Sequence, residues 1–284
     1  MALARRRSAG GKKRCPPRKP AFSVYCSPMT PDRLDRFARH IVLPEVGGAG
    51  QVRLAGAHVV LVGMGGIGNP ALQYLAGAGI GALTLIDDDV IEASNLQRQT
   101  LFMPADMGRA KAHVAAEWAA RFDPVLKVVP QVVRIGADNA NGLLTGADVV
   151  LDGSDNFATR LAVADACVRL GVPLTSAALG RFQGQVANFA GHLPDEACYR
   201  CFVGDAFDAT DCDTCADLGV LGAMVGMVGA FAAMQALRVV LAGASTLGDP
   251  QWGRLQLIDG LAPSMRALRI AKDPACRTCG GLSQ

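Results

Sequence analysis

The sequence predicts an α/β fold: a Rossmann-like, doubly wound and mostly parallel sheet, extended by antiparallel strands and carrying a four-cysteine zinc site. Half of the 284 residues are hydrophobic but only 5% are aromatic. The core must therefore consist mainly of Val, Leu, Ile and Ala, as in buried parallel sheets. Short apolar runs alternate with helical patterns, which favours βαβ units. Two CxxC pairs lie far apart in the chain, and this spacing is typical of a tetrahedral thiolate zinc site.

The first half of the chain contains the alternating strands and helices. A helix over 33–39 and a glycine-rich link at 47–50 precede an apolar strand at 58–62. A helix follows, with Asn69 at its N-cap and Pro70 at its first position. Further along we expect a strand at 83–86, a helix at 108–121, a strand at 128–133 weakened by Pro130, a strand at 149–151 and a helix at 157–170.

The second half contains strands without intervening helices of the right length. Strands at 185–189 and 255–259 are therefore expected to extend the sheet in antiparallel fashion. The uncharged run 218–234 resembles a membrane span but is slightly shorter than the roughly 20 residues that a span needs. We interpret it as a helix buried against the sheet, with no role for a membrane.

The charge is divided unevenly along the chain. Residues 1–31 hold eight Lys or Arg and no acid, so the remainder carries a net charge of −5. We interpret 1–31 as a disordered basic tail or as sequence upstream of a true start at Met29, and 32–284 as a single domain. No nucleic-acid partner is expected. The odd number of cysteines and the absence of a signal-peptide pattern favour the cytoplasm.

A glycine-rich turn carries the first chemical signal. Gly63, Gly65 and Gly68 follow the strand at 58–62 and open the next helix, where backbone N–H groups can approach a phosphate. Asp87 ends the next strand, where a carboxylate can accept hydrogen bonds from a ribose. This pattern predicts nucleotide binding but also suits NAD. No GxxxxGK[ST] sequence is present, which excludes a P-loop site.

Two cations favour ATP over NAD. A triphosphate carries about four negative charges, and Arg98 and Lys111, together with a metal ion, can neutralise them as pyrophosphate departs. Asp155 follows a strand and could hold magnesium, although it could instead cap the next helix. Each cation alone could be a solvated charge, but Asn95 and Gln99 lie beside Arg98 and make that interpretation weaker.

Taken together, these motifs resemble the ThiF/MoeB/HesA family of adenylating enzymes over residues 32–284. The matching segments are 63–68, Asp87 with 94–99, Lys111, 152–156, 198–201 and 276–279. The resemblance implies a homodimer that uses ATP to adenylate the C-terminal glycine carboxylate of a small β-grasp sulfur carrier ending in Gly-Gly. It leaves open whether the pathway makes molybdopterin, thiamine or another product.

The resemblance also implies a role for each matched residue. Arg39 would reach into the partner subunit's ATP site, Asp87 would hold the ribose, and Asn95, Arg98 and Lys111 would hold phosphates. Asp155 would bind magnesium. The remaining nucleotide-binding positions would be Gly63, Gly65, Gly66, Gly68, Gln99 and Asn156. Zinc would be held, away from the chemistry, by Cys198, Cys201, Cys276 and Cys279. Cys215, in the expected crossover loop at about 203–217, is a candidate for a covalent step.

Alternatives remain at this point. The same sheet could serve an NAD-dependent oxidoreductase, which would leave the cysteine pairs and Arg98 unexplained. Alternatively, the protein could be a nucleotide-binding regulator cross-linked by zinc, which would bind ATP without catalysing a reaction. The CxxC pairs could be redox-active in place of metal-binding. Because no sulfur-transfer domain is recognised, we expect a separate sulfurtransferase to supply persulfide.

Overall fold

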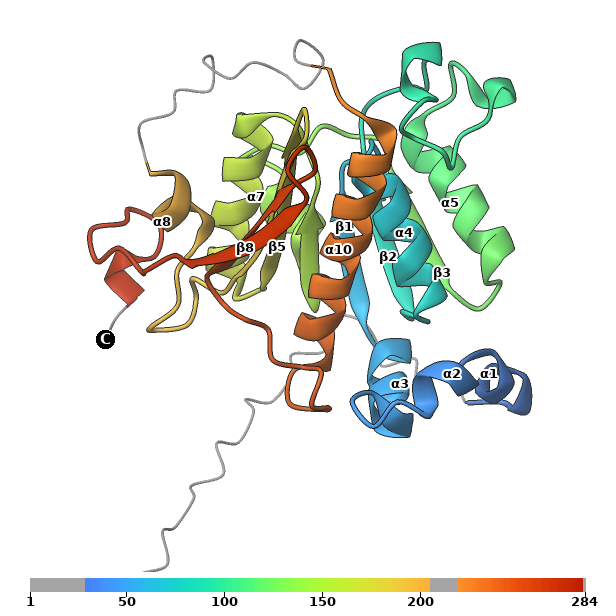
Figure 1. Cartoon of the computed structure of the whole chain (residues 1–284), viewed down its shortest axis with the longest axis horizontal. Coiled ribbons are helices and arrows are strands. Elements are labelled where there is room, and N and C mark those ends of the chain that lie inside the picture. The colour runs from blue at the N-terminus through green and yellow to red at the C-terminus, as the bar shows by residue number, and fades with distance from the viewer. Residues whose placement is uncertain (1–28, 205–218, 283–284) are drawn as a thin grey trace, which may run out of the picture.

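A single twisted sheet forms the centre of the computed structural model, which describes residues 29–204 and 219–282 (Figure 1). Its strands are β1 (His58–Val62), β2 (Ala82–Ile86), β3 (Lys127–Gln131), β4 (Val149–Asp152), β5 (Leu174–Gly180), β6 (Gln183–Phe189), β7 (Arg254–Asp259) and β8 (Ser264–Arg269). Within the described residues their order is β3-β2-β1-β4-β5-β6-β7-β8. The first five strands in this order pair in parallel, and β6, β7 and β8 are added antiparallel.

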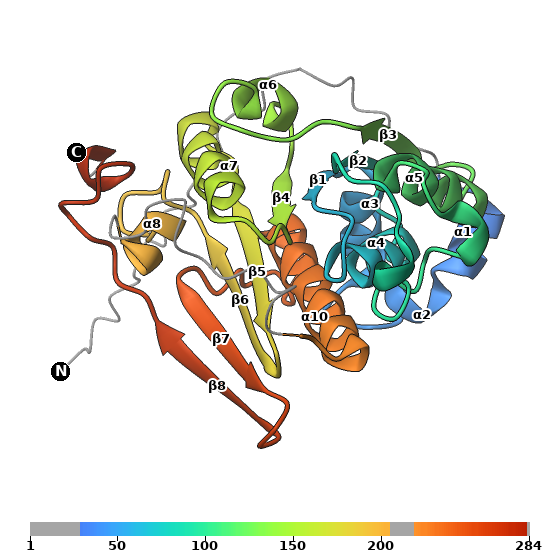
Figure 2. The same cartoon turned by 90° about the horizontal axis from the view of Figure 1, so that it is seen from above.

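Helices cover both faces of this sheet. They are α1 (Pro31–Arg36), α2 (Ala38–Ile41), α3 (Gly47–Ala55), α4 (Gly68–Gly77), α5 (Lys111–Phe122), α6 (Ala140–Leu144), α7 (Phe157–Leu170), α8 (Tyr199–Val203) and α10 (Gly222–Leu241). Short 3-10 turns lie at Ala93–Asn95, Pro104–Asp106 and Gly280–Leu282. Figure 2 shows α7 on one side of β4 and β5, and α10 on the other.

The alternation of side chains in β1 divides the core in two. Val59 and Leu61 belong to the apolar cluster under α4, α5 and α10. Val60 and Val62 belong to the cluster under α6 and α7. All five residues of β1 are buried, as expected for a central strand with helices on both faces. The prediction of a doubly wound, mostly parallel sheet with antiparallel additions is confirmed.

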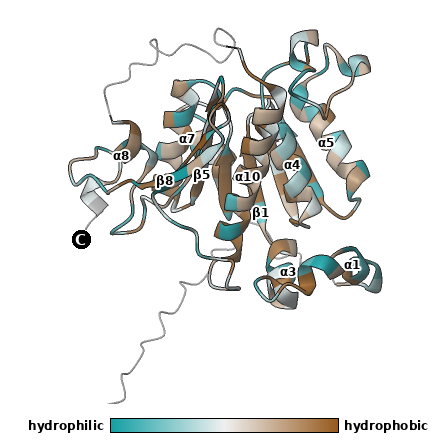
Figure 3. Ribbon diagram, in the orientation of Figure 1, coloured by the Kyte–Doolittle hydropathy of each residue, from teal (hydrophilic) through white to brown (hydrophobic). Residues whose placement is uncertain are grey.

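Helix α10 accounts for the long apolar run. By length and composition it could cross a membrane, but 61% of its most apolar window is buried inside this domain. Hydrophobic and neutral residues run along most of it (Figure 3). At Gly229 an added Cβ would lie 2.4 Å from Pro70 of α4, so this glycine allows the two helices to pack closely. α10 is therefore a core helix here, as the sequence predicted.

Several local expectations were wrong. The glycine-rich link at 47–50 is the first turn of α3, and the helix expected from 108 begins at Lys111. Asn69 lies inside α4 instead of capping it; its amide donates to the Met64 carbonyl at 2.8 Å and accepts from the Leu101 N–H at 3.1 Å. Strands β5 and β8 were not anticipated. Pro130 is tolerated because β3 lies at the edge of the sheet.

The turn between β1 and α4 is closed so tightly that one position admits no side chain. A Cβ added at Gly68 would lie 1.9 Å from the carbonyl oxygen of Gly63, far inside van der Waals contact. Gly63 itself has φ +85°, a left-handed conformation that favours glycine. The sharp reversal therefore depends on glycine at both ends of the turn.

We predict that Gly68→Ala lowers the free energy of unfolding by about 3 kcal/mol or more, because the backbone must open to admit the methyl group. Gly77→Ala, at the other end of α4, is the matched control, because nothing lies within 4 Å of its added Cβ. That variant should gain up to about 1 kcal/mol from its better helix propensity. Urea denaturation measures both, and equal stabilities would contradict the tight-turn argument.

Candidate functional site

A cavity of about 380 Å³ opens between the carboxyl ends of β1 and β4. At this point the order in which successive strands are added to the sheet reverses. We call the cavity the β1–β4 pocket; it is lined by the glycine turn, the segment after β2, the start of α5, the loop after β4 with the start of α7, and the end of β5, including Gly65, Asp87, Arg98, Lys111, Asp155 and Arg160. β1 continues into α4 toward β2 on one side, whereas β4 continues into α7 toward β5 on the other. Ligands of open α/β sheets bind at such switch points.

The glycine turn forms the floor of the pocket. Among the described residues, the backbone N–H groups of Gly65 and Gly66 meet no backbone acceptor. A Cβ on Gly63 would lie 3.1 Å from the Ser154 nitrogen, so the turn lies directly against the loop after β4. Free N–H groups at the start of a ten-residue helix favour an anionic group such as a phosphate.

Asp87 holds this turn in place. Its carboxylate accepts the Met64 N–H at 2.6 Å and the Asp89 N–H at 2.8 Å. Burial raises the pKa of Asp87, and the Asp89 N–H and Lys111 offset this only in part. The carboxylate is thus tied to both the β1 and the β2 ends, at the place where the sequence predicted a ribose contact.

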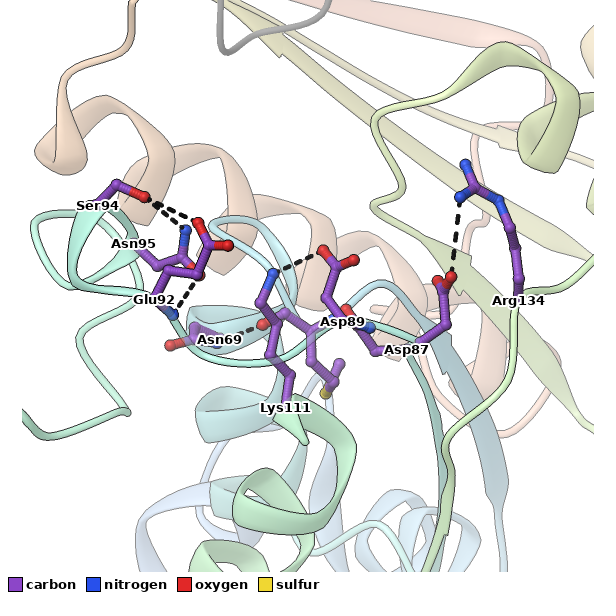
Figure 4. Close-up of polar contacts among 10 residues, drawn as sticks. Asn69, Asp87, Asp89, Glu92, Ser94, Asn95, Lys111 and Arg134 are labelled. Atoms are coloured by element: carbon purple, nitrogen blue, oxygen red, sulfur yellow. Dashed lines mark hydrogen bonds and ion pairs between the residues drawn. The ribbon is translucent and has the colours of Figure 1, made fainter. Parts of the chain in front are cut away.

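Lys111 begins α5 and points into the same region (Figure 4). Only 5% of this residue is exposed, and its ammonium lies 2.8 Å from the Asp89 carboxylate. Asp89 is largely exposed, so this ion pair can exchange for a bound anion at modest cost. Arg134, which the sequence analysis missed, lies 3.8 Å from Asp88 on the opposite wall.

The segment after β2 supplies the other predicted polar groups. Arg98 donates to the Ser94 carbonyl at 2.9 Å. Asn95 accepts the Glu92 N–H at 3.2 Å and is buried. The Oε1 atom of Gln99 is buried without a hydrogen-bond partner among the described residues. An unsatisfied amide oxygen beside Gly65 indicates that a ligand or water completes this wall.

Asp155 and Asn156 lie at the rim after β4. Asn156 is the helix cap: its Oδ1 accepts the Thr159 N–H at 2.9 Å. Asp155 is exposed, lines the pocket and has no ion-pair partner among the described residues. Its carboxylate is therefore available to a ligand, and the alternative that Asp155 caps α7 is wrong. Among the described residues the clustered carboxylates are Asp87, Asp88 and Asp89, not Asp155.

Arg160 is a buried arginine that the sequence analysis missed. It donates to the carbonyl oxygens of Ser154 and Ala177, the latter at 2.9 Å, and lies 3.4 Å from the Ser176 hydroxyl. It lines the pocket and has no carboxylate partner in the described part of the chain. In sequence, Arg160 lies three residues before Val163 and seven before Cys167, so it shares the apolar face of the predicted helix; a charged residue on that face is a signal that could have been found.

Two predicted residues are not in this pocket. Arg39 lies on α2, is exposed, and does not line the β1–β4 pocket of its own chain. Cys215, with most of the expected crossover loop at 203–217, lies outside the described residues, as does most of the basic segment 1–31. Gly63, Gly65 and Gly66 line the pocket, whereas Gly68 acts through the turn.

A separate site lies against the C-terminal half of α7. We call Cys198, Cys201, Cys276 and Cys279 the thiol cluster; all four sulfurs lie within 4.8 Å of one another. Neighbouring sulfurs are 3.4, 3.6 and 3.8 Å apart. A metal–sulfur bond of about 2.3 Å in a tetrahedron requires sulfurs about 3.8 Å apart. The cysteines are free and much farther apart than the roughly 2.05 Å of a disulfide. The cluster can therefore hold a metal ion.

Comparison with known proteins agrees with this geometry. The sequence pattern of the ThiF family matches residues 37–278. The chain is 40% identical over 248 residues to the SAMP-activating enzyme E1 of Haloferax volcanii, covering 87% of this chain and 89% of that protein. It is 41% identical over 256 residues to the sulfur carrier protein adenylyltransferase of Thermus thermophilus, covering 88% and 92%.

Longer relatives and solved structures extend the comparison. The chain is 42% identical to the adenylyltransferase and sulfurtransferase MOCS3 of Bos taurus, over 92% of this chain but only 57% of that protein. The crystal structure of E. coli MccB superposes with a TM-score of 0.73 at 23% identity, covering 86% of this chain and 72% of that one. At this identity the superposition shows the fold alone.

We predict that Arg160→Lys lowers the free energy of unfolding by about 2 kcal/mol, because lysine has no second terminal nitrogen to reach the Ser176 hydroxyl and its ammonium is more strongly hydrated than a guanidinium, so it costs more to bury. Arg169→Lys is the control, since Arg169 lies on the same helix, is exposed and, among the described residues, hydrogen-bonds only to Asn141 Oδ1. Guanidinium denaturation compares the two variants. If Arg160→Lys is as stable as Arg169→Lys, Arg160 does not join β5 to the loop after β4.

Proposed function

The chain belongs to the ThiF family, and from this premise we propose that it uses ATP to adenylate the C-terminal glycine carboxylate of a small ubiquitin-like sulfur carrier protein. The relative named sulfur carrier protein adenylyltransferase supports this substrate class. Molybdopterin and thiamine synthesis are the two pathways that we consider first.

The observation that carries the proposal is the set of four cationic side chains in the β1–β4 pocket, which is also lined by four aspartates (Asp87, Asp88, Asp89 and Asp155). Arg98, Lys111, Arg134 and Arg160 all line it, and the free N–H groups of the glycine turn lie at its floor. A triphosphate carries about four negative charges and needs several cationic side chains and N–H donors to bind it. The pyrophosphate of NAD is held largely by the glycine turn itself. The four cations, together with a metal ion held by a carboxylate, favour ATP and weigh against an NAD-dependent oxidoreductase.

The chemistry needs no strong base. The carrier's carboxylate is already ionised at neutral pH. One carboxylate oxygen forms a bond to the α-phosphorus of ATP; the bond from that phosphorus to the bridging oxygen breaks, and its electron pair leaves with pyrophosphate. The product is a mixed anhydride with AMP, open to attack by sulfur. Lys111 and Arg98 neutralise the charge that develops on the leaving group, and the glycine turn fixes the direction of attack.

Asp155 fits the role of magnesium ligand. Magnesium prefers one or two protein carboxylates together with phosphate oxygens, and Asp155 presents an unpaired carboxylate at the pocket. When bound, the ion would neutralise charge on the phosphates. Asp87 is committed to backbone N–H groups and would accept hydrogen bonds from the ribose instead.

We also propose a homodimer in which Arg39 completes the partner's pocket. Arg39 is exposed and does not line the pocket of its own chain, so it is free to contact another subunit. Large apolar side chains near it are exposed: Val42 at 70%, Leu43 at 46% and Val52 at 44%. Such a patch is typical of a protein interface.

For the thiol cluster we propose zinc. Four thiolates at tetrahedral spacing are the usual ligands of structural zinc. Burial raises the pKa of the Cys279 thiol to about 11, so the thiolate form needs a cation among the sulfurs. The free cysteines suit a reducing compartment, and we place the protein in the cytoplasm.

We predict ATP–pyrophosphate exchange that depends on one carrier from a panel of proteins ending in Gly-Gly. Asp155→Ala should lower the rate by at least about 10²-fold, since it removes the metal-holding carboxylate. Arg98→Ala should act in the same direction. Asp138→Ala is the control, because Asp138 is exposed and does not line the pocket.

Other results of the exchange assay would point to a different function or to a different metal ligand. ATP binding without exchange for any carrier would favour the nucleotide-binding regulator. Failure to bind ATP, with retention of a nicotinamide, would favour the oxidoreductase. Normal exchange by folded Asp155→Ala would remove the assignment of Asp155.

We predict one zinc per chain in the purified protein, measured by elemental analysis. Cys279→Ser should lose the metal and lower the melting temperature, because the metal joins two distant segments of the chain. Cys167→Ala, which removes a buried cysteine outside the cluster, should keep its zinc. A folded, metal-free wild-type protein would contradict the prediction.

A further inference from the structure

The two CxxC segments share a contact that neither motif reveals in sequence. Asp165, in the middle of α7, accepts hydrogen bonds from Arg200 and from Thr278. Arg200 lies between Cys198 and Cys201, and Thr278 lies between Cys276 and Cys279. One carboxylate therefore joins both halves of the thiol cluster, which are about 75 residues apart in the chain.

The contact is the same at both segments. Arg200 and Thr278 each occupy the third position of their CxxC sequence. The Arg200 Nε and the Thr278 hydroxyl both donate to the same oxygen, Asp165 Oδ1, at 2.7 and 2.8 Å. The second Arg200 nitrogen donates to Oδ2 at 2.8 Å. This bidentate pair and the added hydroxyl fix the carboxylate in one orientation.

The surroundings of Asp165 make these bonds strong. The Arg200 side chain is 7% exposed and that of Asp165 is 22% exposed. Burial alone would raise the pKa of Asp165, but the hydrogen bonds from Arg200 and Thr278 outweigh it and hold the pKa below its usual range. One turn further along α7, Val168 packs against Cys198, Cys276 and Cys279. α7 therefore offers both halves of the cluster one polar and one apolar contact.

We propose that Asp165 is a positioning residue that holds the two CxxC segments at the separation a tetrahedral metal ion requires, and thereby sets how tightly the metal is kept. Without this carboxylate, the segments would have to be ordered by the metal itself, at a cost in binding free energy. The inference depends on the thiol cluster being the zinc site proposed above. It assigns Asp165 no contact with the metal.

Asp165→Asn tests this directly, with Asp138→Asn as the control because Asp138 is exposed and has no ion pair among the described residues. Zinc affinity is measured by competition with a chromogenic chelator, and zinc release by the rate after excess chelator is added. We expect about 10–100-fold weaker affinity and faster release for Asp165→Asn, the range known for groups that orient metal ligands. The control should match the wild type.

If Asp165→Asn fails to fold, two smaller changes at Thr278 test the same contact. Thr278→Val removes only the hydroxyl, and Thr278→Ser keeps it. We expect weaker zinc binding for the valine variant and wild-type binding for the serine variant. Circular dichroism must first show that both variants are folded. If the Thr278 hydroxyl only stabilised the fold, Thr278→Val would lower the melting temperature but would bind zinc as tightly as Thr278→Ser.

Three results would overturn the proposal. These are wild-type zinc affinity in folded Asp165→Asn, equal affinities for Thr278→Val and Thr278→Ser, or no zinc binding by the wild-type protein. The last would also remove the zinc assignment. None of them touches the adenylation proposal, which pyrophosphate exchange tests independently.

Discussion

The arrangement of the β1–β4 pocket depends on the closure of one turn, in which Gly68 lies so close to the Gly63 carbonyl that no Cβ fits. This closure places the start of α4 at the carboxyl ends of β1 and β4. Among the described residues, the N–H groups of Gly65 and Gly66 then have no backbone acceptor. Asp87 then ties the turn to β2 through the Met64 N–H. The groups that we propose to bind phosphate and ribose are thereby fixed before any ligand arrives, so little ordering cost remains for binding.

Helix α7 links the two sites of the domain. Its N-terminus follows Asp155 and is capped by Asn156 at the pocket, and Arg160 in its first turn joins β5 to the same loop. Asp165 and Val168 meet the thiol cluster farther along. Tyr199, between two cysteines of the cluster, lies beside Phe157 with ring centroids 6.5 Å apart. A metal in the cluster would thus stabilise the same helix that presents Asp155.

Much of this could be predicted because the signals are local. A glycine pattern after an apolar strand specifies a turn and a helix, and CxxC spacing specifies paired ligands, so the sheet and the gathering of Cys198, Cys201, Cys276 and Cys279 followed from sequence. Asn69 was misplaced because its side chain bonds Leu101, a tertiary partner that outweighs its capping preference. Arg160 and Asp165 were missed because their roles come from residues brought together only by folding. Residues 1–28 and Cys215 lie outside the described structure.

In the proposed reaction, a carboxylate of the carrier attacks the α-phosphorus of ATP in the β1–β4 pocket. The most direct measurement labels the carrier's terminal carboxylate with ¹⁸O, traps the activated acyl group with hydroxylamine, and analyses the nucleotide by mass spectrometry. We expect a labelled oxygen in AMP, because the attacking oxygen stays bonded to the α-phosphorus when hydroxylamine attacks the carbonyl carbon. Label in inorganic phosphate, or AMP that forms without label, would contradict the proposed reaction.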